Sequence, residues 1–397
     1  SDCRGVIMNL LFVSSRNIYN STGELRLVKT RANVLKEKFN ISSDFICIRN
    51  KEILNSPQEV IDSDSKFFLF TYSMTNMFSY DSSKKNVEKK IREIISEYDA
   101  VILSGELVLS FVNLVKSISS VKVIYDIHGV CDELSEFSSG KFLVNCKRKF
   151  IYYLFQHLEK KYIPKFDAAF AVTSELKEHV EKKYNAHKLN YFIVPCTKKH
   201  YNIDRLKIAE SREIYRKKYS VHSNDVLFIY SGGYSPWQCI DESIDLFTKI
   251  NTKMPNSKFL ILSMDKDKID THGNKNIIKD LVTADEVDSV LCAGDYAFML
   301  RGDYVTNHVA FPNKYCEYLA SGMKIISSPY LYSISKNIVK FNTGIVLNNN
   351  DDFETLINYI DKNKCCKNNV SKIQEILYEI SFDKTLEPVA NYLKSGD

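Results

Sequence analysis

Short apolar runs alternate with longer amphipathic segments along almost the whole of this 397-residue chain. A strand-length apolar run followed by a helix-length segment is typical of a βαβ unit, in which helices cover both faces of a parallel sheet. In the first half the expected strands are Leu10–Val13, Asp44–Ile48, Phe67–Tyr72, Ala100–Leu103, Val121–Tyr125, Ala168–Val172 and Tyr191–Val194. The expected helices there are Glu24–Phe39, Lys84–Glu97 and Lys147–Tyr162. The alternation therefore predicts an α/β fold built on parallel strands.

The alternation stops once, in a polar stretch near residues 195–204, and then restarts. The expected strands of the second part are Val226–Tyr230, Phe259–Ser263, Tyr296–Leu300, Lys324–Ser327 and Gly344–Leu347. Its expected helices are Cys239–Ile250, Ala284–Cys292, Asn313–Ala320 and Asp351–Ile360. We therefore expect two Rossmann-like domains, over residues 8–196 and 205–380, that bind ligands at the carboxyl ends of their strands. Met8 has the form of a natural start, so residues 1–7 do not enter this prediction.

Composition and charge exclude several other classes of protein. Only 13 Gly and 8 Pro disfavour a turn-dense all-β fold. A net charge of +5 lacks the concentrated basic footprint of a nucleic-acid-binding protein. The ten Cys form no C-x-x-C pair, and no apolar run approaches the ~18 residues that a membrane span needs. We expect a reduced, cytoplasmic protein that binds no nucleic acid.

The most informative segment begins where the third expected strand of the second domain ends in Arg301. A polar loop leads from it to Pro312, which suits the start of a helix, and Gly322 suits the left-handed residue after that helix. The free N–H groups of a helix start form an anion site, to which Arg301 and Lys314 add positive charge. Glu317 lies one turn further on, where a carboxylate can accept hydrogen bonds from a ribose diol. Spacing alone is equally compatible with an ordinary βαβ unit that has a surface Arg and Glu.

This segment resembles the donor-binding region of GT-B glycosyltransferases, specifically the family 4-like branch common among bacterial surface-polysaccharide transferases. The resemblance rests on Leu300, Arg301, Asn307, Ala310, Pro312, Lys314, Glu317, Tyr318, Leu319, Ala320, Gly322 and Ile326. It implies that Glu317 binds the donor ribose and that the helix start after Pro312 holds the diphosphate, with Ala310 and Lys314 beside it. It also implies that a final helix, within residues 381–397, crosses back onto the first domain.

One position departs from the family pattern. Many members have a further Glu near the donor sugar, eight residues before the ribose-binding Glu, whereas this chain has Val309 there. The branch that it resembles often lacks that Glu, so the change does not indicate an inactive enzyme. Asn307 and His308 are the nearest polar residues for the sugar.

Three further loops extend the resemblance over the donor site. Gly232 and Gly233 follow the first strand of the second domain and would let backbone N–H groups approach a phosphate, although an ordinary tight turn is the alternative. Thr283 precedes a helix after the loop that cups the nucleobase in the family, and Glu286 would complete a capping box there. Gly23 lies in the glycine-bearing loop that family members turn toward the cleft.

On the acceptor side, Asp126 and His128 form an Asp-x-His-Gly element directly after an expected strand. The resemblance makes them the candidate catalytic residues, with His128 orienting or activating the acceptor or contacting the donor sugar. Two D-x-D triplets, at 62–64 and 265–267, resemble the motif with which another glycosyltransferase fold holds Mn²⁺. We interpret them as solvated loop acids and expect neither a metal nor a cofactor, since the nucleotide sugar is a substrate.

Residues 141–165 combine basic and aromatic side chains with a single acid, Glu159. Such a composition suits an anionic membrane surface, whereas a core helix with solvated basic ends is the alternative. Membrane contact fits the lipid-linked acceptors that are frequent in the resembled family.

The resemblance therefore implies a hexosyl- or N-acetylhexosaminyltransferase that uses a nucleotide-diphosphate sugar, UDP-linked in the first place, and retains the anomeric configuration. We expect a saccharide or lipid-linked acceptor, in capsule or other cell-surface polysaccharide synthesis at the inner face of the membrane. Two alternatives stay open, a sugar-nucleotide 2-epimerase of the same fold and a nucleotide-binding scaffold without turnover.

Overall fold

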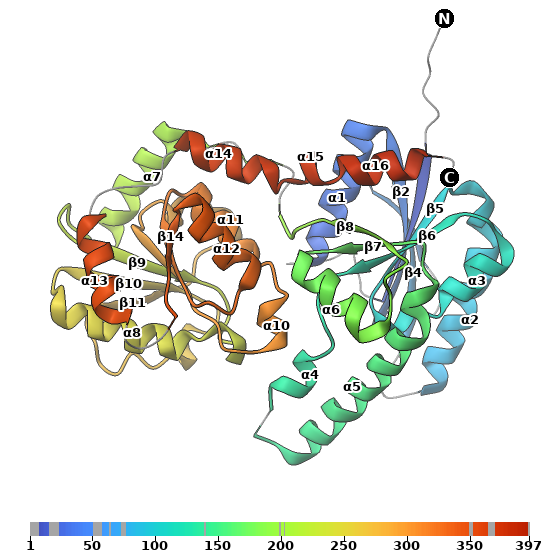
Figure 1. Cartoon of the computed structure of the whole chain (residues 1–397), viewed down its shortest axis with the longest axis horizontal. Helices are drawn as coiled ribbons and strands as arrows, with labels where there is room; N and C mark the ends of the chain where they lie inside the picture. Colours follow the sequence, from blue (N-terminus) through green and yellow to red (C-terminus); the bar gives the residue numbers. More distant parts are fainter. Residues whose placement is uncertain are drawn as a thin grey trace, which may run out of the picture. The chain divides into compact units, whose positions relative to one another are not determined.

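The computed structural model describes residues 8–15, 24–50, 58–62, 65–72, 77–138, 140–197, 200–201, 203–348, 352–363 and 370–395. The chain divides into two compact units (Figure 1). Unit 1 consists of the residues up to His200 and the stretch from Ile380 onward, whereas unit 2 consists of Tyr201–Glu379. Unit 2 is therefore continuous in sequence, and unit 1 is assembled from both ends of the chain.

Over the described residues, unit 1 has an eight-stranded sheet with the order β3-β4-β2-β1-β5-β6-β7-β8. Its strands are β1 (Met8–Ser14), β2 (Ile41–Asn50), β3 (Gln58–Asp62), β4 (Ser65–Tyr72), β5 (Ala100–Ser104), β6 (Lys122–Ile127), β7 (Ala168–Ala171) and β8 (Asn190–Ile193). Neighbouring strands are parallel except β3 and β4, which are antiparallel at one edge. The central strand β5 is buried along its whole length, as expected for a sheet covered on both faces.

The helices of unit 1 are α1 (Glu24–Phe39), α2 (Met77–Ile94), α3 (Phe111–Ile118), α4 (Glu133–Glu136), α5 (Phe142–Tyr162), α6 (Ser174–Tyr184), α15 (Phe382–Thr385) and α16 (Glu387–Lys394). The last two lie beside α1 (Figure 1, red and blue). The ring of Tyr392 packs 5.2 Å from that of Phe192, and the Lys122 ammonium donates to the Tyr392 carbonyl at 2.8 Å. The end of the chain thus packs on the unit in which the chain begins, as the sequence predicts.

Unit 2 has a six-stranded parallel sheet within the described residues, in the order β11-β10-β9-β12-β13-β14. Its strands are β9 (Val226–Ser231), β10 (Ser257–Leu262), β11 (Ile277–Asp280), β12 (Tyr296–Met299), β13 (Lys324–Ser327) and β14 (Gly344–Val346). Its helices are α7 (Arg205–Lys218), α8 (Ile240–Lys253), α9 (Ala284–Leu291), α10 (Val305–His308), α11 (Asn313–Ala320), α12 (Tyr332–Phe341), α13 (Phe353–Lys362) and α14 (Val370–Glu379). The core centres on Phe228 of β9, whose ring stacks 5.3 Å from that of Phe298.

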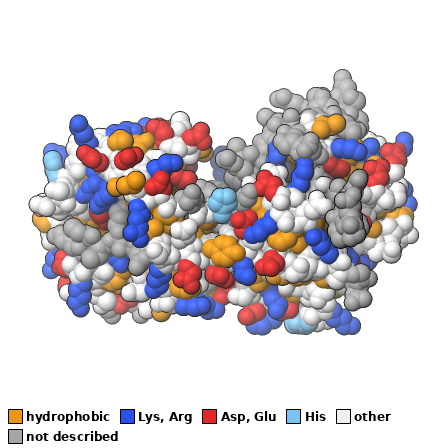
Figure 2. Space-filling view, turned by 90° about the horizontal axis from the view of Figure 1, so that it is seen from above, with side chains coloured by type: hydrophobic (Ala, Val, Ile, Leu, Met, Phe, Trp, Pro, Cys, Tyr) orange, Lys and Arg blue, Asp and Glu red, His pale blue; other side chains and the backbone are white. Residues whose placement is uncertain are grey.

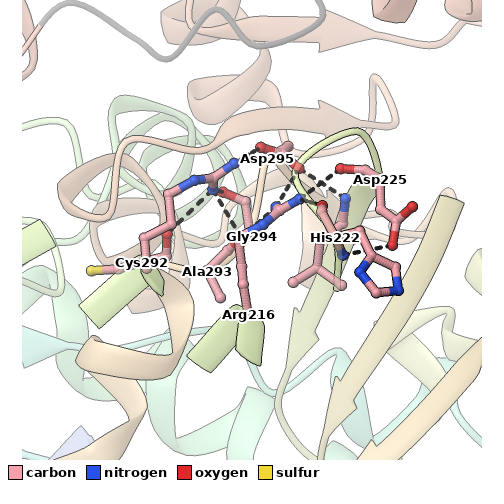
Figure 3. Close-up of polar contacts among 9 residues, drawn as sticks. Arg216, His222, Asp225, Cys292, Ala293, Gly294 and Asp295 are labelled. Carbon is pink, nitrogen blue, oxygen red and sulfur yellow. Dashed lines mark hydrogen bonds and ion pairs between the residues drawn. The ribbon is translucent and has the colours of Figure 1, made fainter. Parts of the chain in front are cut away.

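Helix α7 is fixed to the amino end of this sheet by two arginines (Figure 3). Arg212 donates to Asp295 Oδ1 at 2.5 Å. Arg216 donates to Asp295 Oδ2 at 3.1 Å and to the carbonyl oxygens of His222 and Asp225 at 2.6 and 2.7 Å. Both guanidinium groups therefore have a carboxylate partner as well as the backbone carbonyls around them.

The two-domain α/β fold predicted from the sequence is confirmed, and α1 and α11 have the predicted bounds. The sequence prediction omits the strands β3 and β11 and the helices α3, α6, α7, α12 and α14. β3 and β11 are edge strands with polar residues, QEVID and IIKD, and so they lack the continuous apolar run of a central strand. Mixed polarity conceals an edge strand from any analysis based on apolar runs.

The surface of the molecule carries both signs of charge. On the face shown in Figure 2, Lys and Arg side chains are interspersed with Asp and Glu. Among the described residues no helix is both long and apolar enough to span a bilayer. Every cysteine in the described part of the chain is a free thiol.

Candidate functional site

Arg301 lies directly beyond the carboxyl end of β12, and its side chain is buried in unit 2. Its guanidinium donates to the carbonyl oxygens of Leu300 at 2.7 Å and Gln238 at 3.4 Å. Its backbone N–H and C=O are both bonded to the Ser328 hydroxyl, each at 2.8 Å. These bonds fix Arg301 against the loop 232–238.

Lys314 approaches the same loop from the first turn of α11. A Cβ atom at Gly232 would lie 2.6 Å from Lys314 Cε and 2.7 Å from the Tyr230 hydroxyl oxygen, so the glycine makes room for the lysine. The N–H of Gly232 is already bonded to the Leu262 carbonyl at 2.9 Å, and the Gly233 carbonyl accepts from the Tyr230 hydroxyl at 2.9 Å. Gly232 therefore admits a cation to the loop, rather than offering the backbone N–H that the sequence analysis assigns to it.

The charge of Arg301 perturbs Lys314. Burial lowers the pKa of Lys314, and the neighbouring charge of Arg301 lowers it further, while Glu317 acts in the opposite direction. Burial also lowers the pKa of Arg301, and no carboxylate among the described residues pairs with its guanidinium. Positive charge that is buried without full compensation favours an anionic ligand.

Helix α11 places its polar residues on one side. Tyr315, Cys316, Tyr318 and Leu319 are buried. Lys314 and Glu317, three residues apart, share the less buried face. Pro312 immediately precedes the first helical residue, and Gly322 has φ 81° after the helix, as the sequence predicts for a left-handed terminus. The Tyr318 hydroxyl accepts a bond from the Ser231 N–H at 3.0 Å, which fixes α11 to the end of β9.

The loop between β12 and α11 holds the other predicted sugar-side residues. Asn307 is buried, and its amide donates to the Gly302 carbonyl at 2.9 Å, so it braces the loop. His308 is bonded through Nε2 to Asp303 Oδ1 at 2.7 Å, and its ring stacks 4.3 Å from that of Tyr332. Of the two predicted residues, Asn307 and His308, only His308 reaches the surface.

The neighbouring positions have local roles. Val309 is buried, whereas Ala310, which follows it, is half-buried. Thr283 precedes the first residue of α9, and both its N–H and its hydroxyl donate to Glu286 Oε2, at 3.2 and 3.0 Å, in the predicted capping box. These bonds end the β11–α9 loop at a fixed position.

In the second D-x-D triplet, residues 265–267, the Asp265 carboxylate is hydrogen-bonded within the protein. Asp265 accepts bonds from the Tyr234 N–H at 3.1 Å and from the Lys268 ammonium at 2.7 Å. Within the described residues no cluster of three or more His, Cys, Asp or Glu could hold a metal ion. The first triplet is only partly within the described residues, and Gly23 lies outside them.

A second polar group forms in unit 1, at the carboxyl end of β6. The Asp126 carboxylate is buried, and it contacts His128 Nε2 at 2.9 Å and Arg31 Nη1 at 2.7 Å. Burial alone would lower the pKa of His128, but the Asp126 carboxylate raises it to about 10. The Arg31 and His128 charges in turn hold the pKa of Asp126 well below its usual range, against the effect of burial. The Asp126 carboxylate therefore favours the charged form of His128, which suits a hydrogen-bond donor and not a base.

The structure thus brings Arg301, Lys314 and Gly232 together in unit 2. In unit 1 it brings Asp126 and His128 together and adds Arg31, which the sequence prediction omits. A signal for Arg31 exists in the sequence. The residue stands on α1 four positions after Leu27, three after Val28 and four before Leu35, all buried, so it occupies the apolar stripe of the helix. A charged residue in such a stripe needs a buried partner.

Comparisons with known proteins found no matching family profile and no matching curated protein. Solved structures match over nearly the whole chain. A UDP-forming α,α-trehalose-phosphate synthase from Burkholderia vietnamiensis has a TM-score of 0.65 at 10% identity, covering 98% of this chain and 100% of its own. WaaG, a glycosyltransferase involved in lipopolysaccharide biosynthesis, has a TM-score of 0.62 at 12% identity, covering 97% and 100%.

Anabaena Alr3699/HepE, solved in complex with UDP, has a TM-score of 0.66 at 12% identity, covering 98% of this chain and 100% of its own. Structural similarity at sequence identities this low establishes the fold alone, and the chemistry depends on the residues of this chain. The matches cover 98% of this chain, so they include both units and the C-terminal helices α15 and α16. The chain therefore has the GT-B fold of these glycosyltransferases.

Proposed function

We propose that the protein is a glycosyltransferase that takes a sugar from a nucleoside-diphosphate sugar, with UDP as the nucleotide. The observation that carries the proposal is the pair of neighbouring cations, Arg301 and Lys314, at the carboxyl end of the unit 2 sheet. A diphosphate supplies the negative charge that this pair lacks, and Glu317 on the same helix face suits the ribose. Solved structures of the same fold include a UDP-forming enzyme and a complex with UDP, which supports the choice of nucleotide.

The binding step is tested by calorimetry of UDP, GDP, CDP and ADP with the full chain. We expect UDP to bind most tightly and Lys314→Met to weaken it by at least tenfold. Lys249→Met is the matched control, because Lys249 is exposed on α8, and it should leave the affinity unchanged. Equal affinities in both variants would overturn the assignment of the cradle.

The chemical step separates transfer from the alternatives. With a panel of UDP-sugars and water as the acceptor, a transferase releases UDP slowly, whereas a 2-epimerase forms the epimer and a scaffold changes nothing. We propose a hexose or N-acetylhexosamine as the transferred sugar, a saccharide or lipid-linked acceptor of cell-surface polysaccharide synthesis, and retention of configuration. Release of the sugar with inverted configuration, followed by NMR, would contradict retention. Turnover in EDTA would support a metal-independent cradle.

We also propose that α5 contacts an anionic membrane. Phe142 is 79%, Leu143 80% and Phe150 69% exposed on this helix. The basic residues around them are Lys141, Lys147, Arg148, Lys149, Lys160, Lys161 and Lys165. The single acid, Glu159, is buried, so the exposed face offers apolar and positive groups together. Each basic residue near such a surface contributes about 1 kcal/mol to the attraction.

Sedimentation with vesicles tests this contact. The full chain should bind vesicles rich in phosphatidylglycerol and not pure phosphatidylcholine. Replacing both Phe142 and Leu143 by Ser should reduce binding at least tenfold, whereas Leu206→Ser, at a residue 75% exposed on α7, should not. Equal loss in both variants would show that α5 has no special role.

A further inference from the structure

Arg31 is a fully buried arginine in the interior of unit 1. Its Nη1 atom lies 2.7 Å from Asp126 Oδ1. Its Cζ atom lies 5.5 Å from the ring centroid of Phe170 on β7 and 5.5 Å from that of Phe382 on α15. The guanidinium is therefore held by three elements that are distant in sequence, one of which belongs to the returning C-terminal segment.

The Asp126 carboxylate divides its two oxygens between two cations. Oδ1 faces Arg31, and Oδ2 faces His128 Nε2 at 2.9 Å. With Oδ1 fixed by Arg31, the carboxylate presents Oδ2 to the imidazole in one orientation. The other ring nitrogen, Nδ1, is buried, and the Cys196 side chain lies beside the ring, whereas 16% of the His128 side chain is exposed. The arrangement thus holds the imidazole in one orientation, with part of the side chain at the surface.

Stability alone does not account for a buried arginine here. Two charged groups, Arg31 and Asp126, are withdrawn from water, and the Nε atom of Arg31 is buried without a hydrogen-bond partner in the described part of the chain. Apolar residues of similar volume at such a site are often as stable or more stable. The geometry instead favours a role in orientation.

We propose that Arg31 is a positioning residue for His128, and that Phe382 holds Arg31 in place from the C-terminal segment. This inference rests on the proposed function, because it assumes that His128 acts on the transferred sugar or its acceptor. Arg31 fixes Asp126 and Asp126 fixes Nε2 of His128, so the imidazole is held in one orientation. By analogy with the groups that orient metal-binding histidines, loss of such a partner should reduce activity roughly 10- to 100-fold.

The protonation state of His128 separates Arg31 from Asp126. The groups that face the ring are Asp126 from β6, Arg31 from α1 and Cys196 from the loop after β8. Asp126 raises the pKa of His128 and Arg31 lowers it, so Arg31→Met should leave the imidazole charged at pH 7.5. Asp126→Asn should leave it neutral, because burial then acts without the carboxylate. Loss of turnover in Arg31→Met would therefore reflect lost orientation and not lost charge.

The decisive measurement is a double-mutant cycle on turnover in the full chain. Arg31→Met should reduce kcat roughly 10- to 100-fold and change the affinity for UDP less than twofold. In a His128→Gln background the same substitution should have no further effect on kcat. Arg31→Lys, which keeps a charge near Oδ1, should restore part of the loss. An equal loss in both backgrounds would show a structural role and overturn the proposal.

Two measurements keep the proposal testable if Arg31→Met does not fold or if no sugar transfer is found. Phe382→Leu keeps an apolar side chain but removes the ring, and it should reproduce the loss of kcat to a smaller degree. The proton between His128 Nε2 and Asp126 should give a downfield NMR signal, assigned by its absence in His128→Gln. That signal should broaden or vanish without Arg31. If it persists unchanged in Arg31→Met, Arg31 does not position His128, whether or not the protein transfers sugar.

Discussion

The amino and carboxyl ends of the unit 2 sheet both hold buried arginine, and they treat its charge in opposite ways. At the amino end, Arg216 donates to Asp295 (Figure 3). Asp295 also accepts from Arg212 and from the Leu227 N–H of β9. At the carboxyl end, Arg301 donates only to backbone carbonyls within the described residues, and Lys314 adds a second positive charge beside it.

The difference distinguishes a structural charge from a binding charge. A guanidinium with its own carboxylate is complete, and it stabilises the fold so long as both partners remain. A guanidinium without one lowers the stability of the empty protein and is complemented when an anion binds. The same residue type in the same sheet therefore serves the fold at one end and, in our proposal, the donor at the other.

The largest effect should come from removing Asp295. Asp295→Ala leaves Arg212 and Arg216 without their carboxylate, and we expect it to lower the free energy of unfolding by about 3–5 kcal/mol. Urea unfolding followed by circular dichroism measures this. Asp245→Ala, at an exposed residue of α8, should cost less than 1 kcal/mol. If the two variants were equally stable, the amino-end network would not be structural.

The carboxyl end should respond in the opposite way. Arg301→Met should weaken UDP binding by about 2–4 kcal/mol, which is roughly 30- to 1000-fold, because a buried charged contact to the ligand is lost. Its melting temperature without nucleotide should be unchanged or higher, because an uncompensated buried charge is removed. A fall in melting temperature with full affinity for UDP would erase the contrast between the two ends.

Glu317 should have a smaller effect than Arg301. Glu317→Ala should weaken UDP binding by about 1.5–3 kcal/mol, the scale of hydrogen bonds that involve a charged group. Comparing UDP with uridine and with inorganic diphosphate by calorimetry locates the loss. The affinity for uridine should fall and that for diphosphate should not, and the reverse pattern would remove Glu317 from the ribose contact.

Lys314 makes the contrast dependent on pH. The pKa of Lys314 in the folded protein is lower than its ordinary value of 10.5. At pH values between the folded-state pKa and 10.5, the folded state therefore binds fewer protons than the unfolded state. The contribution of Lys314 to stability therefore rises with pH in that window, while UDP affinity falls as the charge is lost. Lys314→Arg should flatten both dependences. Parallel changes of stability and affinity would contradict this account.

The smallest effect should follow removal of divalent metals. Activity in EDTA should stay within about twofold of that in Mg²⁺ or Mn²⁺, because Arg301, Lys314 and the start of α11 supply the positive charge. Loss of activity in EDTA that Mn²⁺ restores would instead assign Asp265 and Asp267 to a metal site, despite the bond from Asp265 to Lys268.

The sequence predicts the fold well because the central strands are continuous apolar runs and the helices have clear periodicity. It predicts a cradle of Arg301, Lys314 and Glu317 around one helix start, and in the structure Lys314 and Glu317 share a face of α11 and Arg301 neighbours Lys314. It does not reveal that Gly232 accommodates Lys314, because the approach of a side chain from another element leaves no pattern in the chain.

The contacts of Asn307 and Arg31 also could not be predicted from local sequence patterns. The motif assigns Asn307 to the sugar, whereas its amide is directed to the Gly302 carbonyl within the loop. Arg31 resembles a surface residue of a basic helix until its place in the apolar stripe is noticed, and its partner Asp126 is 95 residues away. Pairings across such distances depend on the topology of the sheet, which local patterns do not contain.

The division of unit 1 between the two ends of the chain has a consequence for biosynthesis. The ribosome completes unit 2, residues 201–379, before it reaches α15 and α16, so unit 2 can fold while unit 1 still lacks its last two helices. Until then Arg31 has no Phe382 ring against it, and Lys122 has no Tyr392 carbonyl to bond. A chain that stops between residues 379 and 382 would therefore keep the cradle of unit 2 and lose the Phe382 contact that supports Arg31 and, through it, His128.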